Sequence, residues 1–208
     1  RRDRGRVTAM ASRRKKRLPK DFEDLLEQGD LIRLRAVFNA CLLDARGGYV
    51  ALDRQERSRW DEGRVREGLR VLDTALVMHR PGPYQLQAAI AAVHAEASAP
   101  EDTDWARIAT FYEALARVAP SPVVEVNRAV AVGFADGPAA GLARLRPLVS
   151  DPALAAYAPL HAAHADLLRR AGDRDGAADA YRRAVEHTAN AVERAELERR
   201  LADLIRPR

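Results

Sequence analysis

Small residues recur at fixed spacing between His161 and Thr188, and this pattern constrains the fold of the 208-residue chain more than any other feature. Ala165 and Ala177 stand where two helices of a pair would cross, because only a small side chain fits at a close crossing. Gly172 permits a left-handed turn between the helices. Tyr181 is large enough to fill the gap toward the next pair. The stretch therefore predicts a tightly packed pair of antiparallel helices.

Together with Leu168 and Ala184, these residues fall at the spacing of a tetratricopeptide repeat, which this part of the sequence resembles. A weaker copy lies about 35 residues earlier, around Ala129, Val132 and Gly137. The last predicted helix, over 190–205, carries the charged face that the terminal helix of such an array needs. The pattern predicts helix pairs stacked into an array.

Prolines and glycines divide the preceding sequence into further helices. Apolar residues at helical spacing predict one helix over 53–79 and another over 84–97, which Pro83 can start. Thr103 is the expected N-cap of the helix that carries Trp105. Three dipeptides place a capping residue before a proline and predict further helix starts, at Ser121–Pro122, Gly137–Pro138 and Asp151–Pro152. The predicted fold class is all-α, a tetratricopeptide-like helical array (α-solenoid) with about ten helices and no strand.

Charge and composition divide the chain into three parts. Residues 1–17 hold nine Arg or Lys against one Asp, which predicts a disordered basic arm, and 18–49 reads as a short segment of two helices. Residues 50–208 form the predicted helical, tetratricopeptide-like domain. The lone Cys41 excludes an intrachain disulfide. No apolar run is long enough to span a membrane and no leader opens the chain, so we expect a cytoplasmic location without membrane contact.

Residues 52–207 resemble the C-terminal part of those extracytoplasmic-function RNA polymerase sigma factors that carry a tetratricopeptide extension. The resemblance rests on six stretches taken together. They are Asp53–Trp60 (DRQERSRW), Gly82–Glu96 (GPYQLQAAIAAVHAE), Thr103–Trp105 (TDW), Pro120–Ala131 (PSPVVEVNRAVA), Gly137–Leu142 (GPAAGL) and Leu167–Ala184. In that family the extension follows the two sigma regions that read promoter DNA and bind core polymerase, and it modulates them.

This resemblance implies a regulatory protein-interaction module whose partners are sigma regions or core RNA polymerase. The chain departs from the family in one respect, because the sequence before Leu52 is too short to hold either promoter-reading region. It is therefore not expected to initiate transcription alone. The segment 18–49 instead resembles the opening repeat of an ankyrin-type protein. Together, the two resemblances imply a rearranged or truncated gene product.

Five residues are the candidate partner-binding side chains. Asn127 and Arg128 lie on an expected inner helix, from which helical repeats present amide and guanidinium groups to a peptide. The alternative is that Asn127 bridges two helices and Arg128 is solvated. Trp105 is either an interface anchor or a buried core residue. Tyr84 and Gln87 complete the predicted binding set.

Two other function classes compete with the interaction module. A nucleic-acid-associated scaffold would use the basic arm for salt-sensitive phosphate contacts, through Arg13, Arg14, Lys15, Lys16 and Arg17. A metal-dependent enzyme would use His161 and His164, which share a helix face, but no third ligand follows at metal-binding spacing. His94 with Glu96 matches no catalytic signature and reads as a packing residue. We expect neither an enzyme nor a cofactor or metal.

Overall fold

The computed structural model of the chain describes Arg57, Trp60, residues 62–77 and residues 82–206. These residues form eight α-helices and two 3₁₀ helices, and no strand occurs among them. The α-helices are α3 (Glu62–Val77), α4 (Pro83–Glu96), α5 (Trp105–Val118), α6 (Pro122–Ala135), α7 (Pro138–Val149), α8 (Ala158–Ala171), α9 (Arg174–His187) and α10 (Ala191–Ile205). The all-α fold class predicted from the sequence is confirmed.

Several predictions concern parts of the chain outside the described residues. They are the basic arm over 1–17 with its phosphate-binding candidates Arg13 to Arg17, the two-helix segment over 18–49 with its ankyrin resemblance, and Cys41. The described residues all belong to the third predicted part, 50–208, so the three-part division stays a prediction.

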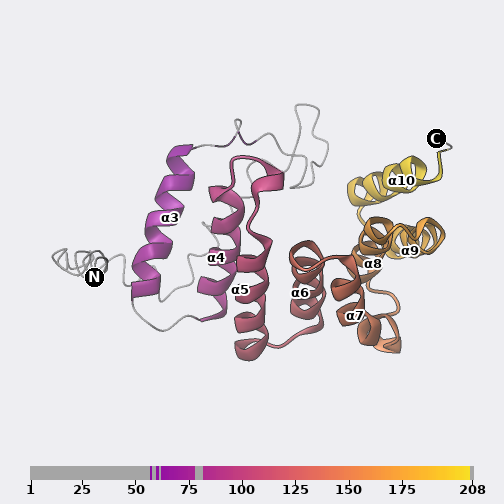
Figure 1. Cartoon of the computed structure of the whole chain (residues 1–208), viewed down its shortest axis with the longest axis horizontal. Helices are drawn as coiled ribbons and strands as arrows, with labels where there is room; N and C mark the ends of the chain where they lie inside the picture. The colour runs from indigo at the N-terminus through magenta and orange to yellow at the C-terminus, as the bar shows by residue number, and fades with distance from the viewer. Residues whose placement is uncertain (1–56, 58–59, 61, 78–81, 207–208) are drawn as a thin grey trace, which may run out of the picture.

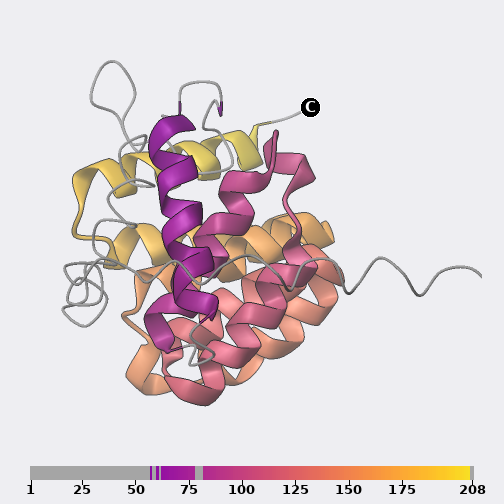
Figure 2. The ribbon, with the colours of Figure 1, turned by 90° about the vertical axis from the view of Figure 1, so that its left-hand side faces the viewer.

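The helices pack in chain order, so that each lies against the next (Figure 1). Helix α6 also contacts α8, two steps along the chain, which is how successive pairs of a solenoid meet. Helix α3 stands at one end of the stack, in front of the other helices in the end-on view of Figure 2. The arrangement is an elongated, solenoid-like array.

The predicted pair over 161–188 is formed by α8 and α9. Ala165 and Ala177 are fully buried where the two helices cross. Gly172 has φ of 88°, in the left-handed region that favours glycine. Tyr181 is 1% exposed and packs in a cluster with Leu204 of α10. Each role assigned to these residues from the spacing is confirmed.

The weaker copy is formed by α6 and α7. Ala129 and Gly141 precede Ala165 and Ala177 by the same 36 residues, and they make the corresponding crossing. Gly137 turns the chain between the two helices with φ of 99°. The repeat therefore extends over both pairs.

Two capping predictions are confirmed and three boundaries are corrected. Ser121 accepts a hydrogen bond from the Val124 N–H at 3.2 Å, and Pro138 begins α7 after Gly137. The cap of α5 is Asp104 and not Thr103, since the Asp104 Oδ1 accepts from the Arg107 N–H at 2.9 Å while Thr103 is buried.

The other two corrections concern helix starts. Asp151–Pro152 begins only the 3₁₀ helix Pro152–Leu154, and α8 starts at Ala158. Helix α3 begins at Glu62 and not at Asp53, because Arg57 lies in a 3₁₀ turn and Trp60 in a bend. Capping residues can close a short turn as well as start a helix, which is why the prediction at Asp151–Pro152 failed.

Candidate partner-binding face

Four side chains from four helices stack in a continuous row, which we call the aromatic ladder. The ladder consists of His94 on α4, Trp105 on α5, Phe134 on α6 and Arg170 on α8. The Trp105 and Phe134 rings stack with centroids 4.2 Å apart and planes 25° apart. His94 meets the Trp105 ring edge-on at 5.3 Å, and the Arg170 Cζ lies 3.8 Å from the Phe134 centroid.

The Phe134 ring is held between a second ring and a cation. Trp105 and Arg170 both lie about 4 Å from its centroid, so they must occupy opposite faces. Stacked aromatic pairs and cation–π contacts each contribute on the order of 1 kcal/mol beyond simple burial. The ladder therefore joins successive helix pairs to one another along one edge of the array.

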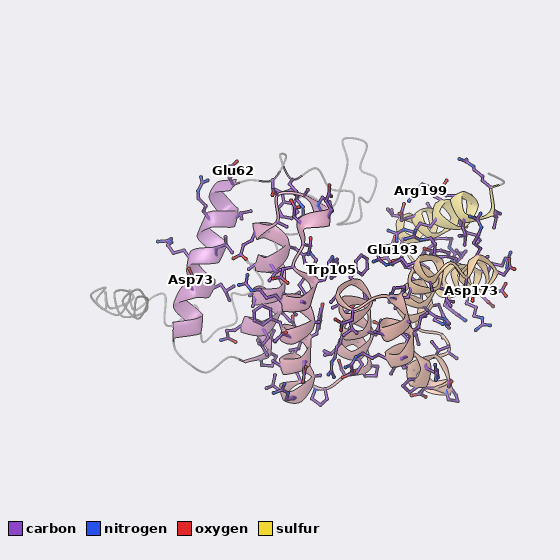
Figure 3. All side chains as sticks on the ribbon, viewed as in Figure 1. Glu62, Asp73, Trp105, Asp173, Glu193 and Arg199 are labelled. Atoms are coloured by element: carbon purple, nitrogen blue, oxygen red, sulfur yellow. The ribbon has the colours of Figure 1, made fainter. Side chains whose placement is uncertain are left out.

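The repeat geometry explains why these side chains meet. Phe134 and Arg170 are 36 residues apart, the repeat length, and each lies in the last turn of its helix. Equivalent positions of stacked repeats lie side by side. Trp105 begins α5 directly after the Asp104 cap, which directs it from α5 toward α6 (Figure 3). Trp105 and Phe134 are half-buried and Arg170 is exposed, so a surface part of the ladder remains open to a partner.

His94 is held in its neutral form by its surroundings. Burial, followed by the positive charge of Arg57, lowers the pKa of His94 to about 4. Glu96 pairs instead with Arg107, at 2.7 Å. The candidate acid–base combination of His94 and Glu96 is thus divided between a stacked imidazole and an ion pair.

Arg57 contributes a second cation near the His94 end of the ladder. Its guanidinium carbon lies 4.2 Å from the centroid of the Trp60 ring. The Arg57 Nε and Nη1 atoms and the Trp60 Nε1 atom are buried without a hydrogen-bond partner. Burial lowers the pKa of Arg57. The positive charge of Arg57 is therefore the second cause, after burial, that holds His94 neutral.

The sequence-predicted binding residues do not all share one surface. Trp105 belongs to the ladder, whereas Asn127 on α6 is exposed and has no contact that places it there. The Arg128 side chain is only 18% exposed and lies 3.6 Å from Glu125 and 3.9 Å from Glu113 of α5. Its charge is directed into the α5–α6 junction.

Tyr84 and Gln87 lie near the start of α4, and both are exposed. His94 and Trp105 meet at the other end of α4, so these two residues are separated from the ladder along the helix. The structure places them on the protein surface without gathering them into a common site with Trp105.

The histidines of α8 are packed within the array. His161 is 4% exposed, and its Nε2 lies 2.6 Å from the Ala155 carbonyl oxygen. Its ring centroid is 5.8 Å from that of His187. Burial, followed by the neighbouring charge of His161, lowers the pKa of His164. Within the described ranges, no group of three or more His, Cys, Asp or Glu residues could hold a metal ion.

Sequence reasoning missed Phe134 and Arg170. The available signal was their separation by one repeat length, which places two residues at equivalent positions of stacked pairs. In chemical terms the ladder offers aromatic faces and an open guanidinium, which suit binding of another chain more than bond cleavage.

Comparison with known proteins gives one relative. No family model matches the chain, and no solved structure matches it. In the described part of the chain, no helix has both the length and the apolar character to cross a membrane. An uncharacterized protein of Rhizobium meliloti (strain 1021) is 44% identical over 161 residues, which make up 77% of this chain. The matched region spans 38% of the length of that curated relative, so more than half of the relative lies outside it.

Proposed function

We propose that this chain is a protein-interaction module that modulates transcription initiation, as the extension of an extracytoplasmic-function sigma factor does. Its partner would be a segment of sigma regions or of core RNA polymerase, and it would act in the cytoplasm. The observation that carries the proposal is the aromatic ladder, which is shared by four helices and partly open at the surface.

The ladder has the composition of a binding surface. Trp, Phe and Arg are enriched at protein interfaces because a large ring or a planar cation gives much contact area for little loss of conformational entropy. In the ladder these groups are already ordered by one another, which lowers the entropy lost on binding. A helical array with such a face is suited to an extended or helical partner segment.

The relative gives the proposal a second support. Its matched region is less than half of its length, so there the helical array belongs to a longer protein. An array attached to further sequence is the organisation expected of a regulatory extension. The resemblance of residues 52–207 to such extensions is the reason for proposing the transcription machinery as the partner.

Co-purification tests the proposal directly. The tagged chain is incubated with core RNA polymerase and, separately, with the two promoter-reading sigma regions from the same bacterium. The proposal is supported if the chain retains either partner and if Trp105→Phe, which keeps an aromatic side chain at this position, weakens that retention. Arg144→Ala, at an exposed position on α7, is the control and should leave retention unchanged. If neither partner is retained, the transcriptional role is wrong.

The basic arm is a second candidate binding element, for nucleic acid, and deleting it distinguishes its contribution from that of the helical array. Nine of residues 1–17 are Arg or Lys, which favours salt-sensitive attachment to nucleic acid. Removing residues 1–17 should abolish any DNA binding and leave the retention of protein partners intact. If the deletion abolished DNA binding and protein retention together, the nucleic-acid scaffold would be favoured over the interaction module.

A further inference from the structure

Arg170 differs from most other arginines of the array because its guanidinium contacts an aromatic ring and not an acidic side chain. Arg169 lies 2.7 Å from Asp166, Arg182 lies 2.5 Å from Asp179, and Arg199 lies 2.7 Å from Glu196. Arg170 is exposed and stacks on the Phe134 ring, and no described residue pairs with its charge. Its guanidinium is ordered by a ring and not by an acid.

Stacking leaves the hydrogen-bonding edges of a guanidinium available. The five N–H donors lie in the plane of the group and point outward from its carbon, and that carbon lies 3.8 Å from the Phe134 centroid, so the donors on the side away from the ring stay available. A carboxylate can approach such an edge with two parallel hydrogen bonds. Because the stack already restricts the Arg170 side chain, binding an acid there loses less conformational entropy than at a free arginine.

The ladder also fixes how far the cation lies from an aromatic contact surface. Trp105 lies on the opposite face of Phe134, so its ring centroid is no more than about 8 Å from the Arg170 Cζ. In an extended segment, side chains two residues apart point the same way and are separated by about 7 Å. An acid and a large apolar side chain at positions i and i+2 therefore match the spacing of Arg170 and Trp105.

We propose that the ladder binds an extended protein segment in which an Asp or Glu, held by Arg170, is two residues from an aromatic or large aliphatic side chain that contacts Trp105. This inference rests on the proposed function, since it names the chemistry of the partner segment. The sigma or polymerase segment that the module binds would contain this acid–x–apolar pattern.

Charges close to the ladder favour a protein segment over a nucleic acid. Arg107 is neutralised by Glu96 at 2.7 Å, and Arg169, next to Arg170, is neutralised by Asp166 at 2.7 Å. Arg57, near His94, has its Nε and Nη1 atoms buried. A phosphate backbone would need a series of unpaired cations along its path. One open guanidinium beside two aromatic rings matches a single carboxylate followed by an apolar side chain.

Fluorescence anisotropy of short labelled peptides tests the inference. The probe is the heptapeptide Gly-Ser-Asp-Ser-Phe-Ser-Gly, and its matched controls replace Asp by Asn or move Phe next to Asp. We expect the probe to bind the full chain about fivefold more tightly than either control peptide. Arg170→Ala should remove that preference, Arg170→Lys should restore part of it, and Arg144→Ala should leave it unchanged.

Three results would overturn the inference. They are equal affinity for the Asp and Asn peptides, equal effects of Arg170→Ala and Arg144→Ala, or tighter Arg170-dependent binding of a labelled single-stranded oligonucleotide. Absence of probe binding at about 1 mM counts as equal affinity.

Co-purification with Arg170→Ala separates this inference from the proposed function. If the transcription partner is retained without regard to Arg170, the module stands and the carboxylate site is wrong. If the peptide binds through Arg170 but neither transcription partner is retained, the site stands and the assignment of the partner is wrong.

Discussion

Gly133 of α6 and Gly141 of α7 pack backbone against backbone, so that a Cβ on Gly141 would stand 2.8 Å from the Gly133 Cα. The same Cβ would lie 2.7 Å from the Ala129 carbonyl oxygen and 2.8 Å from the Leu167 Cδ1. Two of these three atoms belong to the backbone and cannot move independently. This crossing is where the α6–α7 pair meets α8.

Gly141→Ala should therefore destabilise the protein by about 2–4 kcal/mol, although alanine favours helix more than glycine does. Urea unfolding followed by circular dichroism measures the change. Gly172→Ala is the comparison, since its φ of 88° is strained for alanine but no atom lies within 4 Å of the added Cβ. That variant should lose only about 1–2 kcal/mol. Wild-type stability of Gly141→Ala would show that the helices are not in this close contact.

The stacking of Trp105 on Phe134 can be measured as a coupling energy. Trp105→Leu and Phe134→Leu each keep an apolar side chain while removing one ring of the stack. A double-mutant cycle in urea should give a favourable coupling of about 1 kcal/mol. Additive effects of the two substitutions, with no coupling, would contradict the stacked arrangement.

The depressed pKa of His94 predicts a loss of stability in mild acid. The unfolded chain binds a proton at His94 near its ordinary pKa of 6.5, whereas the folded protein binds it only near 4. Stability is therefore complete above about pH 6.5 and falls as the pH drops toward 4, by up to about 2 kcal/mol at pH 5.

Comparison with His94→Gln isolates this contribution from the titration of carboxylates. Unfolding free energies at pH 7 and pH 5 should fall more for the wild-type protein than for the variant. Equal losses in the two proteins would mean that His94 is not held neutral by burial and by Arg57.

Glu196 on α10 has a lowered pKa, whereas burial alone raises the pKa of an acid. Burial alone would raise its pKa, but hydrogen bonds from Arg199 and Arg200 and their charges lower it to about 2. Glu196 accepts from the Arg199 Nε at 2.8 Å and from the Arg200 Nε at 2.8 Å. Arg199 is labelled in Figure 3. Its stabilising contribution is present above about pH 4.5 and is lost as the pH falls toward 2.

Glu196→Gln should lower the unfolding free energy at pH 7 by about 1 kcal/mol, because Arg199 is partly exposed and solvent screens the pair. Thermal unfolding at pH 7 and near pH 2 measures the difference between wild type and variant. The difference should shrink at the lower pH. A constant difference at both values would show that the arginines do not favour the ionised form.

The helix pairing was predictable because it depends on side-chain size at fixed spacing. Ala165, Ala177 and Gly172 occupy positions where larger residues cannot fit or turn, and this restriction is visible in the sequence. The helix starts were less certain. Thr103 and Asp104 are adjacent capping residues, and burial of Thr103 against the array decided between them.

The candidate site was predictable only through Trp105. The contact between Phe134 and Arg170 depends on two helices being stacked in register, so neither residue stands out in its own segment. Arg128 has one partner of each kind, because Glu125 lies three residues earlier on α6, at 3.6 Å, whereas Glu113 comes from α5, at 3.9 Å, and only the first is visible from sequence spacing. Of these pairings across helices, only that of Phe134 with Arg170 left a signal in the sequence, which was their separation by one repeat length.

The ladder gives the array a mechanical property. A solenoid bends by changing the angle between neighbouring repeats, and Phe134 and Arg170 come from two such repeats. Any increase in curvature that opens this edge must draw the guanidinium off the ring. A segment bound across Phe134 and Arg170 would resist that movement. Occupation of the ladder would therefore stiffen the array. The curvature at this edge would then depend on what is bound there.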